Sequence, residues 1–391
     1  LGGAVKHESY EPMRVDPWLN DWVIYPVDGY GTHEIIRSVL HSEKPDMIWF
    51  MTDPRFYGWL WEIENEVRAN IPMVYYHVWD NFPAPKFNRR YYRSTDEVVC
   101  ISKVTHDILN EVAPDVSSHY LPHAVPDHIF KKATDVESVE KIKGLRRQLI
   151  IDSADSDLQN ANKKIFFWNN RNARRKQSGT LIWWFKEWLD KVGHDKACLI
   201  MHTDARDPHG QDLPHIIEHL GVHRGQVMLS TNKVTPEELS LFYNVADYTL
   251  NISDAEGFGL ATLESLSCGT PIIVNMTGGL QEQVTDGTDW FGWGIQPSSK
   301  AVIGSLQVPY IYEDRVNQGD FEKALSSALK LSKPRYKKMS QGGIKHVKDN
   351  YSFEKYEKGW IKLMDEFIEK HGSWDTRKGY KKWHVVEIKV A

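Results

Sequence analysis

The sequence has few of the features that mark several classes of protein. It contains three cysteines among 391 residues, an odd and small number, and Cys100 and Cys198 lie in apolar, strand-like runs. This usage does not fit a disulfide scaffold, so we expect buried, reduced thiols and a cytoplasmic protein. No window approaches the ~18 uninterrupted apolar residues of a membrane-spanning helix, so no integral membrane segment is predicted.

Charge of one sign is also scarce. The formal net charge of -5 argues against a uniformly basic nucleic-acid-binding protein, although local basic patches survive such an average. The sequence has no internal repeat, and no cluster of His and Cys has the spacing of a zinc site. Its length, with 41% hydrophobic and 26% charged residues, suits a globular protein of two domains. These numbers do not indicate an oligomeric state.

What the sequence does contain is an alternation of short apolar runs with helical periods, which predicts parallel sheets covered by helices. Strands are expected first at 22–27, 47–51, 73–78 and 97–102, and then at 164–168, 197–202, 227–229, 248–252 and 271–274. Helices are expected near 32–40, 58–70 and 136–149, and over 236–245, where Thr235-Pro236-Glu237-Glu238 forms a capping box. The predicted fold class is therefore α/β, with two facing Rossmann-like domains and a ligand cleft at the carboxyl ends of the strands.

Breaks in the alternation suggest the domain boundaries. Two prolines within 121–127 predict a hinge between a first domain at 1–125 and a second at 126–350, and 351–391 holds a helical stretch and a basic tail. The tail from 374 to 391 mixes basic and aromatic residues, as single-stranded nucleic-acid binders do, but a solvated tail is favoured.

The most informative stretch lies within 251–284, where Glu256 and Glu264 stand eight residues apart around Gly257-Phe258-Gly259. A strand enters this stretch, glycines turn the chain, and a helix leaves it. The backbone N–H groups at the start of such a helix are unpaired and carry the positive end of its dipole, which favours a phosphate. Carboxylates do not bind phosphate, but they accept hydrogen bonds from hydroxyl groups. The stretch therefore predicts a site for a phosphorylated sugar.

At these residues the chain resembles the retaining GT-B glycosyltransferases of family 4, whose signature is E-x7-E with Gly-Phe-Gly after the first glutamate. Cys268-Gly269-Thr270-Pro271 and Gly278-Gly279-Leu280-Gln281-Glu282 follow at the spacing of the family. Upstream, 166–176 resembles the family's strand followed by Arg-x4-Lys, here Arg171 and Lys176. The resemblance covers about 45–356. It also implies that 121–127 is the hinge between the domains and that the helix after 352 crosses back onto the first domain. Family members often end their second strand in a Leu-Gly-Gly-like turn, so a first β-α unit is expected to precede Leu1-Gly2-Gly3; a divergent first domain that starts here is the alternative.

The resemblance implies a GT-B fold and the transfer of a sugar from a nucleoside-diphosphate sugar of the UDP or GDP type to a hydroxyl acceptor, with retention of anomeric configuration. It implies a glycan or lipid-linked acceptor on the first domain, and neither a metal nor another cofactor. The implied catalytic residues are Arg171 and Lys176, which hold the departing diphosphate, and Glu256, which contacts sugar hydroxyls. Glu264 is implied to bind the ribose, beside the substrate-binding residues Gly257, Phe258, Gly259 and Leu260. The roles of Arg174 and Arg175 stay open.

Several alternatives remain beside this interpretation. His77, at a strand end, either touches the donor sugar as in the family or is held by a neighbour, and Asp53 is favoured as a turn former over an acceptor contact. The run 257–262 also resembles G-x-G-x-x-G, which would indicate an NAD-dependent oxidoreductase, but it ends in Thr262 and leaves the basic pair unexplained. An inactive sugar-nucleotide-binding module and transfer to a hydroxymethylated base in DNA are further alternatives. Asp155-Ser156-Asp157 forms a D-x-D metal element, yet its polar surroundings favour a plain loop.

Overall fold

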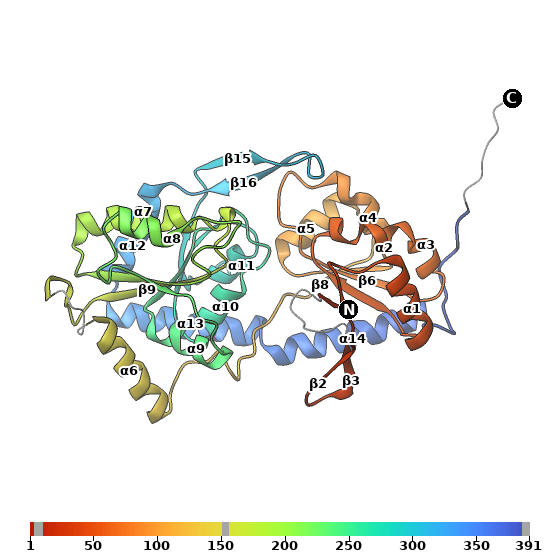
Figure 1. The fold of residues 1–391 in the computed structure, drawn as a ribbon, viewed down its shortest axis with the longest axis horizontal. Helices are drawn as coiled ribbons and strands as arrows, with labels where there is room; N and C mark the ends of the chain where they lie inside the picture. The colour runs from red at the N-terminus through yellow and green to blue at the C-terminus, as the bar shows by residue number, and fades with distance from the viewer. Residues whose placement is uncertain (4–10, 151–155, 385–391) are drawn as a thin grey trace.

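The structure is a computed structural model that describes residues 1–3, 11–150 and 156–384. Two α/β bodies lie side by side and are connected above and below the space between them (Figure 1). Each body is a parallel sheet with helices on both faces, as the alternation of apolar runs and helical periods predicts. The GT-B-like arrangement of two facing Rossmann-like domains is confirmed.

The first domain is built on a parallel sheet in the order β5-β6-β7-β8. Every residue of the inner strand β6 is buried, so the loop that follows β6 toward the cleft begins from a firmly packed position. The strands are β5 (Ile48–Met51), β6 (Met73–His77), β7 (Glu97–Cys100) and β8 (Ser118–Tyr120), and the helices are α1 (His33–Glu43), α2 (Gly58–Glu62), α3 (Glu64–Val67), α4 (Arg89–Arg93) and α5 (Lys103–Val112), with 3-10 turns η2 (Pro54–Tyr57) and η3 (Lys86–Asn88).

A strand forms at 22–27 as predicted, but it does not join the parallel sheet of the first domain. β3 (Leu19–Ile24) pairs antiparallel with β2 (Met13–Val15) in a projecting hairpin, and β4 (Pro26–Val27) pairs with β1 (Gly2–Gly3). Exposed polar residues in β3 explain why that part of the run does not become a buried strand, whereas the two residues of β4 are buried.

The second domain is built on a parallel sheet in the order β11-β10-β9-β12-β13-β14. The chain adds strands outward from β9 in one direction and then, starting with β12, in the other. The carboxyl ends of β9 and β12 are therefore a topological switch point, where loops diverge and ligands bind. The strands are β9 (Lys164–Asn169), β10 (Ala197–His202), β11 (Val227–Ser230), β12 (Tyr248–Asn251), β13 (Ile272–Asn275) and β14 (Gly292–Ile295).

Helices cover both faces of this second sheet, and α9 begins with the predicted capping box at Thr235 and Glu238. The three cysteines are buried and free. The helices are α6 (Val136–Ile150), α7 (Ser178–Val192), α8 (Leu213–His219), α9 (Pro236–Val245), α10 (Leu260–Ser267), α11 (Leu280–Val284), α12 (Gln318–Leu329) and α13 (Lys333–Asn350), with 3-10 turns η4 (Ser156–Leu158) and η5 (Arg174–Lys176). In the described part of the chain, no helix is both long and apolar enough to cross a membrane.

Two segments cross between the domains on opposite sides of the cleft. Helix α14 (Phe353–His371) runs back onto the first domain, as expected, and the ring of Trp360 packs 5.0 Å from that of Tyr76. On the other side, a hairpin of β15 (Ser299–Ile303) and β16 (Ile311–Arg315) reaches over from the second domain (Figure 1). Its tip residue Val308 is buried among apolar side chains of the first domain. The sequence did not indicate this hairpin.

The prediction of a solvated tail holds only in part for its described residues, because Lys378, Lys381 and Lys382 are exposed while other side chains bind the first domain. Arg377 pairs with the buried carboxylate of Asp96 at 2.6 Å, and the ring of Tyr380 lies 4.7 Å from the Arg68 guanidinium. The Trp383 indole donates to Glu64 at 3.2 Å. Arg377, Tyr380 and Trp383 thus bind charged and polar groups of the first domain. Residues 385–391 lie outside the described residues.

Candidate functional site

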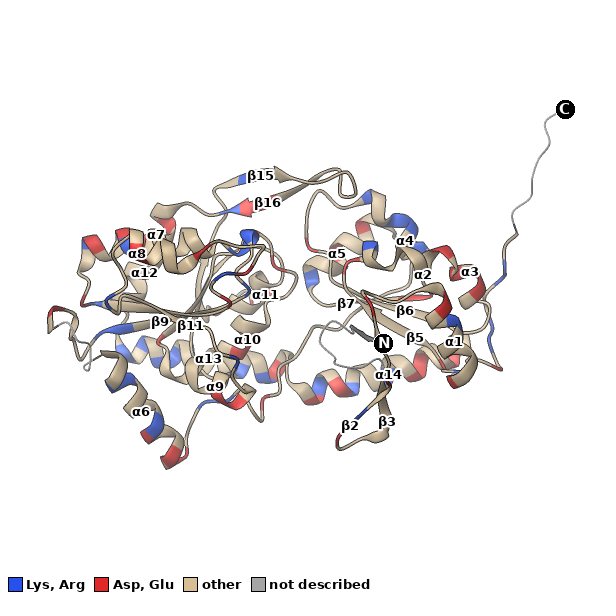
Figure 2. Ribbon diagram, in the orientation of Figure 1, with Lys and Arg blue, Asp and Glu red and all other residues tan. Residues whose placement is uncertain are grey.

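The candidate site is a cleft between the two domains, with a cavity of about 770 Å³. It lies at the carboxyl ends of the strands in both sheets, including the switch point between β9 and β12. In Figure 2, basic and acidic residues are coloured on ribbon segments of both domains that border this space. From the second domain the lining comprises Asn169, Asn170, Arg175, 255–261, Glu264 and the hairpin residues 303–305, Val308 and Ile311; from the first it comprises Thr52, Asp53, Arg55, 78–81, Ile101 and His123.

The loop from β12 to α10 presents its backbone to the cavity. Gly259 caps α10 with φ 93°, a conformation that favours glycine, and a side chain there would lie 2.6 Å from Leu280. Behind the loop, a Cβ on Gly278 would lie 1.7 Å from the carbonyl oxygen of Glu256. The predicted residues 257–260 all line the cavity. The first turn of α10 therefore lies at the cavity wall, and its backbone amides lack intrahelical partners.

Lys176 and Glu256 form a buried ion pair at the switch point. Lys176 lies in η5 after β9, Glu256 lies after β12, and their side chains are only 8% and 12% exposed. Burial alone would raise the pKa of Glu256, but the positive charges of Lys176 and Arg175 hold it below its usual value. The carboxylate therefore stays ionised and acts as a hydrogen-bond acceptor at neutral pH.

Glu264 is positioned by a hydrogen-bond chain that the sequence did not reveal. The Tyr243 hydroxyl donates to Glu264 Oε2 at 2.6 Å, and Asn169 Nδ2 donates to that hydroxyl at 2.9 Å. Burial raises the pKa of Glu264, while the bond from Tyr243 opposes the shift. One carboxylate oxygen is held by this chain, and the side chain reaches the cavity wall one helical turn beyond Leu260.

The structure corrects the placement of the predicted arginine. Arg171 donates to Asp207 at 2.6 and 3.1 Å, its side chain is 60% exposed, and it is not part of the cavity wall. Arg175 lines the cavity instead and donates to the carbonyl oxygen of Ala255. Arg174 pairs with Glu313 at 2.8 Å. The turn after β9 thus directs Arg175, and not Arg171, toward the cleft beside Lys176.

The placement predicted for His77 from the family is also corrected. Its ring is fully buried, bonds to the Tyr92 hydroxyl at 2.8 Å and does not reach the cavity. Burial lowers the pKa of His77 to about 3, so the ring is neutral. Asp53 is the turn former expected, because it caps η2 and pairs with Arg55 at 2.6 Å, although it also lines the cavity.

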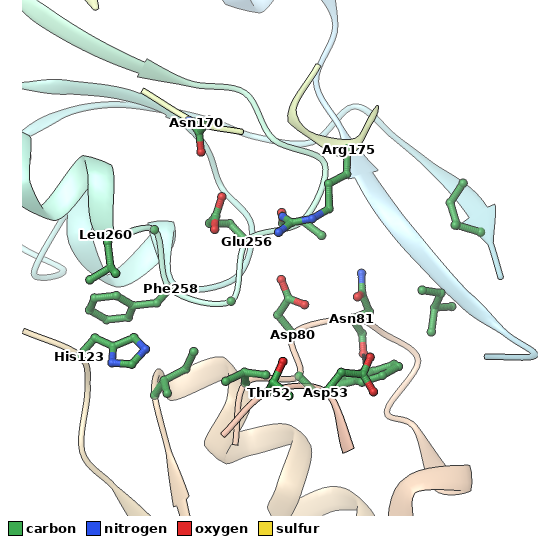
Figure 3. A pocket seen from close by; sticks show the side chains of 18 of the residues that line it. Thr52, Asp53, Asp80, Asn81, His123, Asn170, Arg175, Glu256, Phe258 and Leu260 are labelled. Atoms are coloured by element: carbon green, nitrogen blue, oxygen red, sulfur yellow. Dashed lines mark hydrogen bonds between the residues drawn. The ribbon is translucent and has the colours of Figure 1, made fainter. Parts of the chain in front are cut away.

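Three lining residues were missed by the sequence analysis as functional candidates. The ring of His123 packs 5.4 Å from the ring of Phe258. Asn170 has a buried Nδ2 without a hydrogen-bond partner in the described structure. Asp80 follows β6 and points into the cleft (Figure 3). The available signal for Asp80 was its position, because a carboxylate just beyond a buried parallel strand lies at the ligand edge of a sheet.

Within residues 1–3, 11–150 and 156–384, no three His, Cys, Asp or Glu side chains are placed to hold an ion. The first aspartate of the D-x-D element, Asp155, lies outside the described residues.

Comparison with protein families identifies the site-bearing domain. Residues 153–346, about half of the chain, match the model of the glycosyl transferases group 1. The chain belongs to the group 1 glycosyltransferases. The match includes β9 to β14 and therefore the switch point, the ion pair and α10.

Curated relatives of this group 1 glycosyltransferase match over part of their length. An alpha-monoglucosyldiacylglycerol synthase from Streptococcus pneumoniae is 25% identical over 198 residues, which are 51% of this chain and 41% of that protein. A D-inositol 3-phosphate glycosyltransferase from Corynebacterium jeikeium is 31% identical over 174 residues, 43% of this chain and 40% of that protein. The chain thus spans less than half the length of these relatives.

Solved structures share the fold of this group 1 glycosyltransferase over most of the chain. Sucrose-phosphate synthase from Thermosynechococcus elongatus superposes with a TM-score of 0.69 at 14% identity, covering 93% of this chain and 87% of that one. HepE from Anabaena in complex with UDP-glucose gives a TM-score of 0.64 at 14% identity, covering 85% and 82%. At this identity the likeness concerns the fold, including the facing arrangement of the two domains.

Proposed function

We propose that this protein transfers a sugar from a nucleoside-diphosphate sugar to a hydroxyl group of an acceptor. The observation that carries the proposal is the cluster at the switch point. Glu256, Arg175 and the first turn of α10 line the cavity, and Lys176, which is not part of the lining, pairs with Glu256 from behind it. These groups supply fixed positive charge and amides for a diphosphate, and a carboxylate for sugar hydroxyls.

The roles follow from the chemistry of each group. In the reaction, a bond forms between the acceptor oxygen and the anomeric carbon, and the bond from that carbon to the diphosphate oxygen breaks. Lys176, Arg175 and the α10 amides stabilise the charge that grows on the diphosphate. Glu256 binds hydroxyls of the sugar, and Glu264 binds the ribose. The acceptor's proton passes to the departing phosphate oxygen.

Retention of configuration belongs to this proposal and is supported by the resemblance of the E-x7-E region to retaining enzymes. Attack and departure then occur on the same face of the sugar, so the acceptor hydroxyl approaches from the diphosphate side of the cleft. Proton NMR of the product tests the stereochemistry through the coupling constant of the anomeric proton. A product whose anomeric configuration is opposite to that of the donor contradicts retention.

For the acceptor, we favour a glycan or a lipid-linked saccharide. The names of the relatives point to lipid and phosphoinositol acceptors: one makes a monoglucosyldiacylglycerol, so its acceptor is a diacylglycerol, and the other acts on D-inositol 3-phosphate. A DNA acceptor loses its main support, because Arg377, Tyr380 and Trp383 of the tail bind the first domain. Salt-sensitive binding of duplex DNA by the full chain would restore that alternative.

The donor site is tested by thermal stability in the presence of UDP, GDP, ADP, CMP or NAD, because a ligand that binds the native state raises Tm. We expect one nucleoside diphosphate to stabilise the protein and Arg175→Ala to abolish the shift. Arg171→Ala is the matched control and should keep it. A shift lost in Arg171→Ala but kept in Arg175→Ala reverses the assignment, a shift with NAD alone favours an oxidoreductase, and no shift contradicts the proposal.

A further inference from the structure

Asp80 stands in the first-domain wall of the cleft, opposite the switch point. It follows the buried strand β6 by three residues, so its backbone starts from a fixed position. Figure 3 shows its carboxylate pointing from the first domain toward the wall that carries Glu256 and Arg175. The side chain is half-buried and lies between the two domains.

Asp80 differs from the other carboxylates of the cleft in its partners. Within the part of the chain that the structure describes, no other residue donates a hydrogen bond to its side chain, and only its own backbone does. Asp53 pairs with Arg55, Glu256 with Lys176, and Glu264 with Tyr243. A partly buried carboxylate without donors is costly, so its acceptor sites fit a ligand that brings donors.

The charge around Asp80 defines the class of that ligand. Burial raises the pKa of Asp80 to about 6, Arg175 and Lys176 oppose the shift, and Glu256 adds to it. The side chain is therefore ionised at neutral pH and accepts hydrogen bonds without donating them. An ionised carboxylate repels phosphate, so the matching group is a neutral one with hydroxyl donors.

We propose that Asp80 accepts hydrogen bonds from hydroxyl groups of the transferred sugar, across the ring from Glu256. The sugar subsite is then built by both domains, whereas the nucleoside diphosphate is held by the second domain alone. Asp80 is thus a specificity-determining residue for the sugar. This inference rests on the proposed function, because it takes a nucleotide sugar to be the donor.

The inference is tested by calorimetric titration of wild type, Asp80→Ala and Asp80→Asn with UDP, UDP-glucose, GDP and GDP-mannose. With the pair that wild type binds, we expect Asp80→Ala to weaken the nucleotide sugar about 10- to 100-fold, as loss of a charged hydrogen bond does. Binding of the nucleotide alone should change less than about twofold. Asp53→Ala is the matched control, because it removes a carboxylate of the same wall that has its own partner, and should keep the wild-type ratio of the two affinities.

Asp80→Asn keeps the shape of the side chain and guards against a folding defect, which circular dichroism checks. Equal weakening of nucleotide and nucleotide sugar in both variants, or unchanged binding of both ligands, overturns the role of Asp80 and leaves the donor site standing. Wild type that binds none of the four ligands overturns the proposed function, and this inference falls with it.

Discussion

The buried ion pair of Lys176 and Glu256 makes a prediction about stability that needs no substrate. Replacing Lys176 by Met leaves a carboxylate that is 12% exposed and has lost its ion-pair partner, with only the charge of Arg175 still nearby. Breaking such a buried pair from one side costs about 3–5 kcal/mol, because the remaining charge is uncompensated. At 2–4 °C per kcal/mol for a domain of this size, Tm should fall by about 6–20 °C. The double variant Lys176→Met/Glu256→Gln should recover most of this loss, since it leaves no buried charge.

The assay is urea unfolding followed by circular dichroism, with Lys191→Met as the matched control. Lys191 pairs with Glu322 at 2.6 Å in the same domain, but its side chain is 60% exposed. An exposed pair contributes at most about 1 kcal/mol. The reasoning is refuted if Lys176→Met loses no more stability than Lys191→Met, or if the double variant is as unstable as the single one.

The same pair predicts how the loss depends on pH. In wild type the pKa of Glu256 is lowered, so its stabilising effect is present above the unfolded value of about 4.3 and is lost as pH falls through the folded value. In Lys176→Met the charge of Lys176 no longer opposes the effect of burial, so the pKa of Glu256 rises. Protonation of Glu256 then removes the unfavourable buried charge. The difference in unfolding free energy between the two proteins should therefore shrink as pH falls from 7 to 4. A difference that stays constant over this range contradicts the electrostatic cause.

Further predictions concern three other positions. Tyr243→Phe removes the 2.6 Å bond to Glu264, so UDP or GDP affinity should fall about 5- to 10-fold in titration calorimetry, with a cost in stability of about 1 kcal/mol. Val308→Ser places a hydroxyl in the first domain's apolar cluster, which should cost about 1–3 kcal/mol and speed proteolysis of the hairpin tip, measured by limited digestion. Glu97 is fully buried, and although burial would raise its pKa, bonds from His119 and His371 among others lower it. Glu97→Gln should therefore destabilise the fold in urea at pH 7 and lose this effect as pH falls well below about 4.

The sequence predicted the parts of the site that depend on local pattern. A strand, a glycine turn and a helix are neighbours along the chain, so 257–260 and Glu264 were expected at the ligand edge, where the structure places them. The same is true of the capping box of α9, whose partners are three residues apart. The GT-B arrangement of the two domains was predicted from the resemblance to the family, because local patterns do not show how two domains face each other. The roles of these residues stay predictions.

The sequence failed where a side chain's direction depends on a distant partner. Spacing alone selected Arg171, but Asp207, 36 residues further on, draws its guanidinium away from the cleft. His77 was placed at a strand end without a view of Tyr92, whose hydroxyl holds the ring inside the first domain. Arg175 and Asp80 have no distinctive spacing, and they become candidates only when both walls of the cavity are seen together.

The two crossings between the domains bear on how a donor enters. On one side α14 carries aromatic packing of Trp360 and several further contacts onto the first domain. On the other, the hairpin is held by the burial of Val308 and by a backbone bond from Tyr312 to Phe82 at 2.7 Å. The hairpin packs two aliphatic side chains, Val308 and Ile311, on the first domain, whereas α14 buries the larger Trp360 and Phe367, so opening at the hairpin side costs less free energy than opening at α14. We therefore expect the cleft to open about the α14 side, and a sugar held by both Asp80 and Glu256 to favour the closed state, because it contacts both walls.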